Sequence, residues 1–79
     1  MTVTFDPRRN IAYLRFKEKR DTVRSIPLSD ELIIDIGSDG MIYGIELLNA
    51  NEQLKRDNGG KVSVINEATG KREEISLDF

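Results

Sequence analysis

One continuous stretch decides the fold: Leu32-Ile33-Ile34-Asp35-Ile36-Gly37-Ser38-Asp39-Gly40-Met41-Ile42-Tyr43-Gly44-Ile45-Glu46-Leu47-Leu48. Residues 32–36 alternate, with the even-numbered apolar side chains on one side, which is typical of a strand with one buried face. Asp39-Gly40 then separates two apolar runs and favours a tight hairpin turn, because both residues tolerate a positive φ. Residues 42–48 are apolar at odd and even positions alike, which indicates a central strand covered on both faces.

Further strand signals lie on the N-terminal side of this hairpin. Residues 2–5 alternate, and the turn chemistry of Asp6-Pro7-Arg8-Arg9-Asn10 predicts a second hairpin. In residues 11–17 the even-numbered side chains Ala12, Leu14 and Phe16 share one face. Pro27 interrupts the next extended segment, and because proline donates no ladder hydrogen bond, an edge strand or a bulge is expected there.

The C-terminal part predicts one helix and one more hairpin. Residues 49–56 form a short helical segment that either Asn49 or Asn51 caps. Two glycines end this segment, and apolar residues alternate again on both sides of a turn within residues 61–79. We therefore expect a single domain spanning 1–79, mainly β within the α+β class: an antiparallel β-meander with one short helix near 49–56 and a C-terminal hairpin.

Composition narrows the classes of function. The 79 residues contain neither Cys nor His, so disulfides, Cys/His zinc sites and imidazole acid/base catalysis are absent. We therefore expect no enzyme, no cofactor and no bound transition metal. No apolar run reaches the length of about 18 residues that a membrane span needs, and the N-terminus does not resemble a secretory signal, so a cytoplasmic location is expected.

Four carboxylates are the candidates for an acidic site: Asp6, Asp35, Asp39 and Glu46. Turn chemistry explains Asp6 and Asp39, since each precedes a turn residue. Asp35 and Glu46 are left, and the predicted hairpin places them where they can face each other. With no acidic loop motif, we expect no metal site here.

Charge is unevenly distributed along the chain. Residues 1–29 contain seven Lys or Arg and three Asp or Glu, whereas residues 30–54 contain six acids and no base. This separation suits charge-complementary contact between copies or with another protein. The alternative is a nucleic-acid-binding hairpin, in which basic side chains contact phosphates; its candidate residues are Arg8, Arg9, Arg15 and Lys17. A solvated surface is the commoner role of such residues at sheet edges.

Apolar and aromatic residues on the outward positions of the strands suggest association. Tyr13, Ile33 and Tyr43 are the candidate partner-binding residues. A chain of this length also supplies a small core that barely offsets its ordering entropy, so additional burial against a partner is valuable. The favoured interpretation is a non-enzymatic protein-interaction module that forms a homodimer or larger homo-oligomer, or that binds another protein.

The pattern also resembles a known family. Phe5-Asp6-Pro7, Ala12-Tyr13-Leu14, Leu32-Ile33-Ile34-Asp35 and the run from Asp39 to Ala50 are similar to small bacterial proteins grouped as domain of unknown function 2283. The most specific part is Asp39-Gly40 followed by Gly44-Ile45-Glu46. The resemblance implies a compact antiparallel sheet with a helical segment and no established activity. Two features depart from it: the basic turn Arg8-Arg9-Asn10 and the hairpin of residues 61–79.

Overall fold

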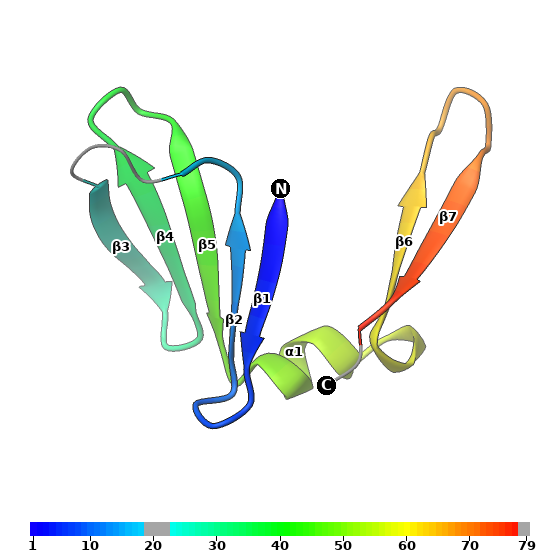
Figure 1. The fold of residues 1–79 in the computed structure, drawn as a ribbon, viewed down its shortest axis with the longest axis horizontal. Coiled ribbons are helices and arrows are strands. Elements are labelled where there is room, and N and C mark those ends of the chain that lie inside the picture. The colour runs from blue at the N-terminus through cyan, green and yellow to red at the C-terminus, as the bar shows by residue number, and fades with distance from the viewer. Residues whose placement is uncertain (19–22, 78–79) are drawn as a thin grey trace.

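The computed structural model describes residues 1–18 and 23–77 and is mostly β-structure (Figure 1). Its strands are β1 (Thr2–Asp6), β2 (Ile11–Arg15), β3 (Val23–Ser29), β4 (Leu32–Gly37), β5 (Ile42–Leu48), β6 (Lys61–Ile65) and β7 (Arg72–Ser76). The α-helix α1 (Ala50–Lys55) and the 3-10 turn η1 (Asn58–Gly60) lie between β5 and β6. Among the residues that the structure describes, no helix is long and apolar enough to span a membrane.

Five strands form one antiparallel sheet in the order β1-β2-β5-β4-β3, and β6 and β7 form a separate antiparallel hairpin. The sheet and this hairpin diverge from the region of α1, so the molecule has the outline of an open V (Figure 1). The predicted meander, short helix and C-terminal hairpin are confirmed. The central place of β5, between β2 and β4, agrees with its apolar residues at both odd and even positions.

The turn between β4 and β5 forms as the Asp-Gly pair predicts. Gly40 has a φ of 82°, which L side chains rarely adopt. The Met41 amide donates to Asp39 Oδ1 over 3.0 Å, and the Gly37 amide donates to the Met41 carbonyl over 2.9 Å. The aspartate therefore holds the turn with its side chain while the glycine supplies the backbone conformation.

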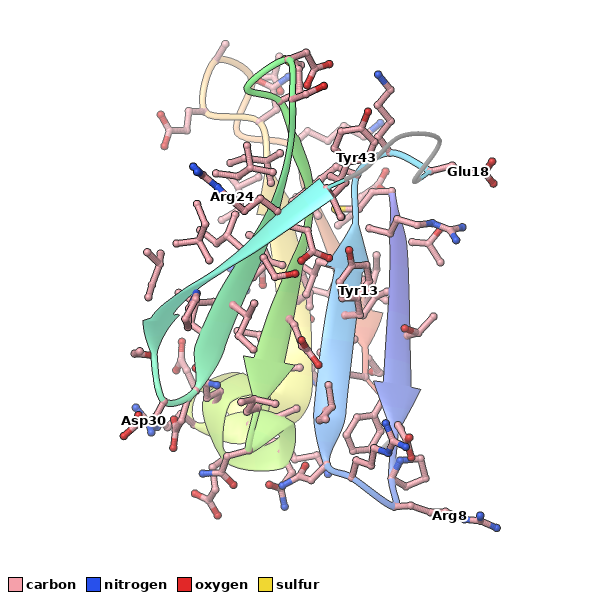
Figure 2. The ribbon with its side chains drawn as sticks, turned by 90° about the vertical axis from the view of Figure 1, so that its left-hand side faces the viewer. Arg8, Tyr13, Glu18, Arg24, Asp30 and Tyr43 are labelled. Carbon is pink, nitrogen blue, oxygen red and sulfur yellow. The ribbon has the colours of Figure 1, made fainter. Side chains whose placement is uncertain are left out.

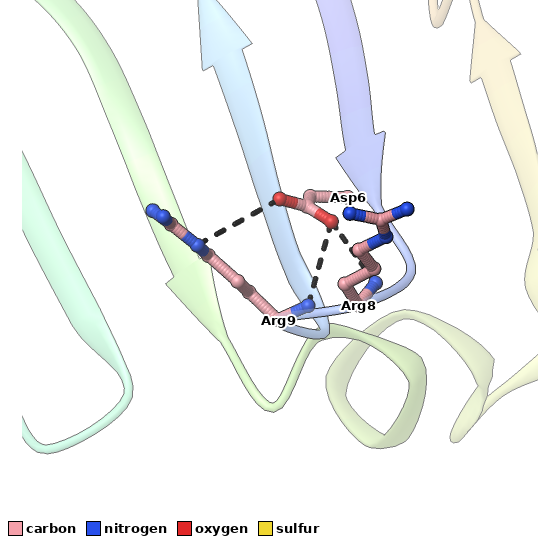
Figure 3. Close-up of polar contacts among 3 residues, drawn as sticks. All are labelled: Asp6, Arg8 and Arg9. Atoms are coloured by element: carbon pink, nitrogen blue, oxygen red, sulfur yellow. Dashed lines mark hydrogen bonds and ion pairs between the residues drawn. The ribbon is translucent and has the colours of Figure 1, made fainter.

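Asp6 performs the same kind of role between β1 and β2 (Figure 3). Its Oδ1 accepts from the amides of Arg8, at 2.9 Å, and Arg9, at 3.4 Å. Arg9 Nε lies 4.0 Å from Asp6 Oδ2, in an ion pair between two largely exposed side chains. Such exposed pairs add little stability, so the contribution of Asp6 to this hairpin comes from its hydrogen bonds to the turn.

Helix α1 is capped from a distant turn. Asn49 occupies the N-cap position with a φ of 52°, but its side chain makes no capping bond. Instead, the Asn51 amide donates to Asn10 Oδ1 over 3.0 Å, and the Ala50 amide donates to the Asn10 carbonyl over 2.9 Å. Asn49 thus occupies the predicted N-cap position without a side-chain capping bond, while Asn51 Oδ1 accepts from the Glu52 amide over 2.8 Å in the first turn. Asn10, with a φ of 56°, ties α1 to the β1–β2 turn.

The two faces of the five-stranded sheet differ in what covers them. The inner face points towards the β6–β7 hairpin and the outer face points away from it (Figures 1 and 2). Strand alternation and register place these apolar side chains on the inner face: Val3, Phe5, Ala12, Leu14, Ile26, Leu32, Ile34, Ile45 and Leu47. Ala12 is the one member of this set that is fully buried, and the described core contains no large side chain below 2% exposure.

Candidate interaction surfaces

A polar row crosses the outer face of the sheet and centres on Asp35. This carboxylate is 5% exposed, and both of its oxygens accept hydrogen bonds. Tyr13 Oη donates to Asp35 Oδ2 over 2.8 Å from β2, and Ser25 Oγ donates to Asp35 Oδ1 over 2.6 Å from β3. Because a buried carboxylate without partners is costly, these donors are what makes Asp35 tolerable at this depth.

Gly44 makes this row possible. It lies on β5 opposite Asp35 in the register, between β2 and β4. A Cβ at this position would overlap Tyr13 Oη, and it would lie 2.5 Å from Tyr13 Cζ and 2.8 Å from the Leu14 carbonyl oxygen. The phenol of Tyr13 therefore crosses over the bare backbone of β5 to reach Asp35. A glycine inside a strand is the sequence signal for such a close approach, whereas nothing in the local pattern indicates Ser25.

The expected pairing of Asp35 with Glu46 does not occur. Asp35 lies opposite Gly44, whereas Glu46 lies opposite Ile33 on one side and Tyr13 on the other. The two carboxylates are therefore offset along their strands, because the register of β4 and β5 is set by the Asp39-Gly40 turn and a bulge beside it. Within residues 1–18 and 23–77, no three acidic side chains gather where they could hold a metal ion.

Tyr43 does not lie on a free surface. It is 2% exposed, at the bulge where Asp35 pairs with Gly44 but Ile36 pairs with Ile42. Its ring lies against Gly37, where a Cβ would overlap ring carbon Cε2, and Lys17 Nζ lies 5.3 Å from the ring centroid. The ring of Tyr43 is therefore covered within the chain rather than exposed, and a role of Tyr43 in partner binding stays a prediction.

The other two candidate partner residues are half-buried on the outer face. Tyr13 is held by its hydrogen bond to Asp35, and Ile33 lies beyond it on β4. Tyr13, Ile33 and Tyr43 thus belong to the same face but do not form an exposed apolar patch. The large exposed apolar side chains lie elsewhere, several of them on the inner side of the V.

The four basic candidates fall into two pairs at opposite ends of the first hairpin. Arg8 and Arg9 lie in the turn after β1, and Figure 2 shows Arg8 at the lower end of the sheet. Arg15 ends β2 and Lys17 follows it, with Lys17 Nζ over the Tyr43 ring. The fold does not bring these four side chains into one cluster.

An apolar groove lies between β1 and the C-terminal hairpin. It encloses a cavity of about 350 Å³ lined by Met1, Val3, Thr4, Phe5, Val62, Val64, Ile75, Ser76 and Leu77. Although they line a groove, Val3, Val64 and Ile75 are 43%, 56% and 55% exposed. This groove continues the inner face of the sheet. The sheet and the β6–β7 hairpin therefore face each other with apolar side chains that neither of them covers.

The C-terminal hairpin is itself two-faced. Val62 pairs with Ile75, and both line the groove. On the opposite face, Arg72 Nη2 donates to Glu74 Oε1 over 2.7 Å and to Ser63 Oγ over 3.0 Å. The face towards the sheet therefore carries Val62, Val64 and Ile75 together with Glu73, whereas Ile65 lies with the polar network on the other face.

Taken together, the fold defines a small α+β domain in which an antiparallel five-stranded sheet ends in a short helix. A family model described as "Protein of unknown function (DUF2283)" matches residues 2–51, more than half of the chain. The protein belongs to this family. The matched part spans β1 to β5 and the start of α1, so the β6–β7 hairpin lies outside it. Searches of curated proteins and of solved structures gave no match.

Proposed function

We propose that this protein is a non-enzymatic, self-associating interaction module whose inner apolar surface is completed by a second copy. The observation that carries the proposal is the inner face itself. It is a largely apolar sheet face opposite a hairpin face on which Val62, Val64 and Ile75 lie beside Glu73, and apart from Ala12 none of its apolar side chains is fully buried. An apolar surface of this extent on a soluble chain marks an association site.

The exposed area supports this proposal. A folded monomer of 9.0 kDa is expected to expose about 4,900 Å². The chain exposes 6103 Å². The excess of about 1,200 Å² is larger than the roughly 800 Å² that each partner buries in a standard stable interface. One copy therefore has enough surplus surface to form a dimer.

The dimensions support the same conclusion. The radius of gyration is 14.1 Å, against about 12 Å for a compact domain of this length. The extra radius comes from the open V, in which the hairpin is held away from the sheet (Figure 1). A second copy carries the same apolar surfaces, so contact between the two grooves covers both surfaces at once.

A matched pair of substitutions on the hairpin tests this proposal. Val64 and Ile65 are neighbours on β6, 56% and 52% exposed, but on opposite faces of the strand. Val64→Asn places an uncharged polar side chain in the groove and should raise the dimer dissociation constant at least about tenfold, because a buried polar group without a partner is costly. Ile65→Asn, on the face away from the groove, is the control and should leave the dissociation constant within about twofold. Equal effects of the two substitutions, measured by sedimentation velocity, would contradict the proposal.

The nucleic-acid alternative predicts a different result. Its basic residues lie in two pairs at opposite ends of the first hairpin, and Arg9 is already paired with Asp6. If that alternative holds, the wild-type chain is a monomer that binds a nucleic-acid oligomer with an affinity that falls steeply as salt rises. A dimer without such binding supports self-association instead.

A further inference from the structure

The two edges of the five-stranded sheet are not equivalent. At the β3 edge, Pro27 removes a donor, and the register shifts between Pro27 and Ser29. Proteins use such features to prevent further strands from pairing with an edge. At the other edge, residues 1–5 contain neither proline nor a charged side chain, and the described register of β1 shows no bulge. The β1 edge is thus the one suited to pairing.

The hydrogen-bonding direction along β1 follows from the neighbouring strands. The Phe16 amide donates to the Tyr43 carbonyl over 2.8 Å, so the even-numbered residues of β2 bond towards β5. Because this direction alternates along a strand, the odd-numbered residues of β2 bond towards β1. Thr4, opposite Tyr13, therefore bonds to β2, and Val3 directs its N–H and C=O away from the sheet. Val3 lies near the middle of the edge strand.

We propose that β1 of one copy pairs antiparallel with β1 of a second copy about a two-fold axis at Val3. The two Val3 residues then exchange both backbone hydrogen bonds, as a directly opposed antiparallel pair does. Thr2 of each copy lies opposite Thr4 of the other on the outer face, and the register brings no like charges together. The dimer joins the two sheets into one. This inference rests on the proposed self-association and names the strand that mediates it.

Space beside β1 is consistent with this pairing. Figure 2 shows β1 at the border of the sheet, with the C-terminal hairpin behind the inner face rather than alongside β1. Because Val3 also lines the groove, pairing at this edge brings the grooves of both copies to the two-fold axis. Edge pairing therefore places the surplus apolar surface of one copy next to that of the other.

A cysteine experiment tests the register directly, because the described chain has no free cysteine and the sequence contains none. Opposed residues at a two-fold axis have Cα atoms about 5.5 Å apart, within disulfide range. Val3→Cys should form a covalent dimer under mild oxidation. Ile65→Cys is the control, since Ile65 is an exposed apolar strand residue, 52% against 43%, on the hairpin face that points away from the groove. Equal cross-linking of the two variants would overturn the proposed pairing.

Charge substitutions provide a second, independent readout. In the proposed register, Thr2→Lys with Thr4→Lys sets like charges opposite each other twice, and should raise the dissociation constant at least about tenfold. Thr2→Lys with Thr4→Glu sets opposite charges there and should leave it near the wild-type value. If the wild-type protein dimerises but both double variants dimerise equally well, the edge pairing is wrong while self-association stands. A monomeric wild-type protein would defeat both proposals.

Discussion

Replacing Gly44 with alanine should destabilise the domain through Tyr13 and Asp35. The added Cβ would lie 2.5 Å from Tyr13 Cζ and 2.8 Å from the Leu14 carbonyl oxygen. The backbone oxygen has little freedom to move, so the ring must. Moving the ring breaks the 2.8 Å hydrogen bond from Tyr13 Oη to Asp35, a carboxylate that is 5% exposed.

Two contributions set the expected loss in free energy of unfolding. A lost hydrogen bond to a charged group costs about 1.5–3 kcal/mol. Overpacking adds about 1–3 kcal/mol. A loss of about 3 kcal/mol is a large fraction of the roughly 4–12 kcal/mol expected for a domain of 79 residues. The corresponding fall in Tm is on the order of 10 °C or more.

The assay is urea unfolding of four proteins: wild type, Gly44→Ala, Tyr13→Phe and the double variant. Phenylalanine lacks the hydroxyl and is not tied to Asp35, so its ring is free to shift away from the new methyl group. Gly44→Ala should therefore cost at least about 1 kcal/mol less in the Tyr13→Phe background, a coupling well above the error of a double-mutant cycle. A Gly44→Ala cost below about 0.5 kcal/mol, or strict additivity of the two substitutions, would refute the reasoning.

Three further predictions concern stability. Gly40→Val should lower the free energy of unfolding by at least about 1 kcal/mol, because the φ of 82° strains a β-branched residue although no atom lies within 4 Å of the added Cβ. Gly40→Asn should lower it by less, and equal free energies of unfolding for the two variants would contradict this. Asn10→Ala should lower the free energy of unfolding by about 1–2 kcal/mol, because the side chain that caps α1 is lost. Asn10→Gly adopts the φ of 56° without strain but lacks the same side chain, so it should also lower the Tm; an unchanged Tm would contradict the role of the cap. Ser25→Ala removes a donor to Asp35 at 2.6 Å and should cost about 1.5–3 kcal/mol; an unchanged midpoint in urea would show that this bond contributes nothing.

Local chemistry made the strands and turns predictable. Asp39-Gly40 favours a tight turn through its own chemistry. Residues 42–48 are apolar at odd and even positions alike, which favours a central strand covered on both faces. Pro27 likewise fixes an edge position because of its missing donor. In each case the determining physics lies within a few residues of sequence.

Other features depend on contacts between distant segments. Tyr43 was expected on an outer face free for a partner, but the bulge after Asp35 turns its ring onto Gly37. Asn10 caps α1 from about forty positions away, and no cap rule anticipates that. Ser25 joins Asp35 only because β3 pairs with β4 in a particular register.

The site was less predictable than the fold for a related reason. The sequence predicts a small core, but it does not show which apolar residues the fold leaves exposed. The structure assigns that surface to the inner face and groove, where Val3, Val64 and Ile75 stay about half exposed, rather than to Tyr43. Whether apolar strand residues are covered depends on how far the hairpin stands from the sheet, and that distance is set by α1 and η1.

The most direct test of self-association is the mass of the wild-type protein in solution, measured by sedimentation equilibrium from low micromolar to near-millimolar concentration. The account predicts a concentration-dependent rise from 9.0 kDa towards about 18 kDa, the mass of a dimer. A constant mass of 9.0 kDa across that range, with a folded far-UV spectrum, would show that the exposed inner face does not mediate self-association.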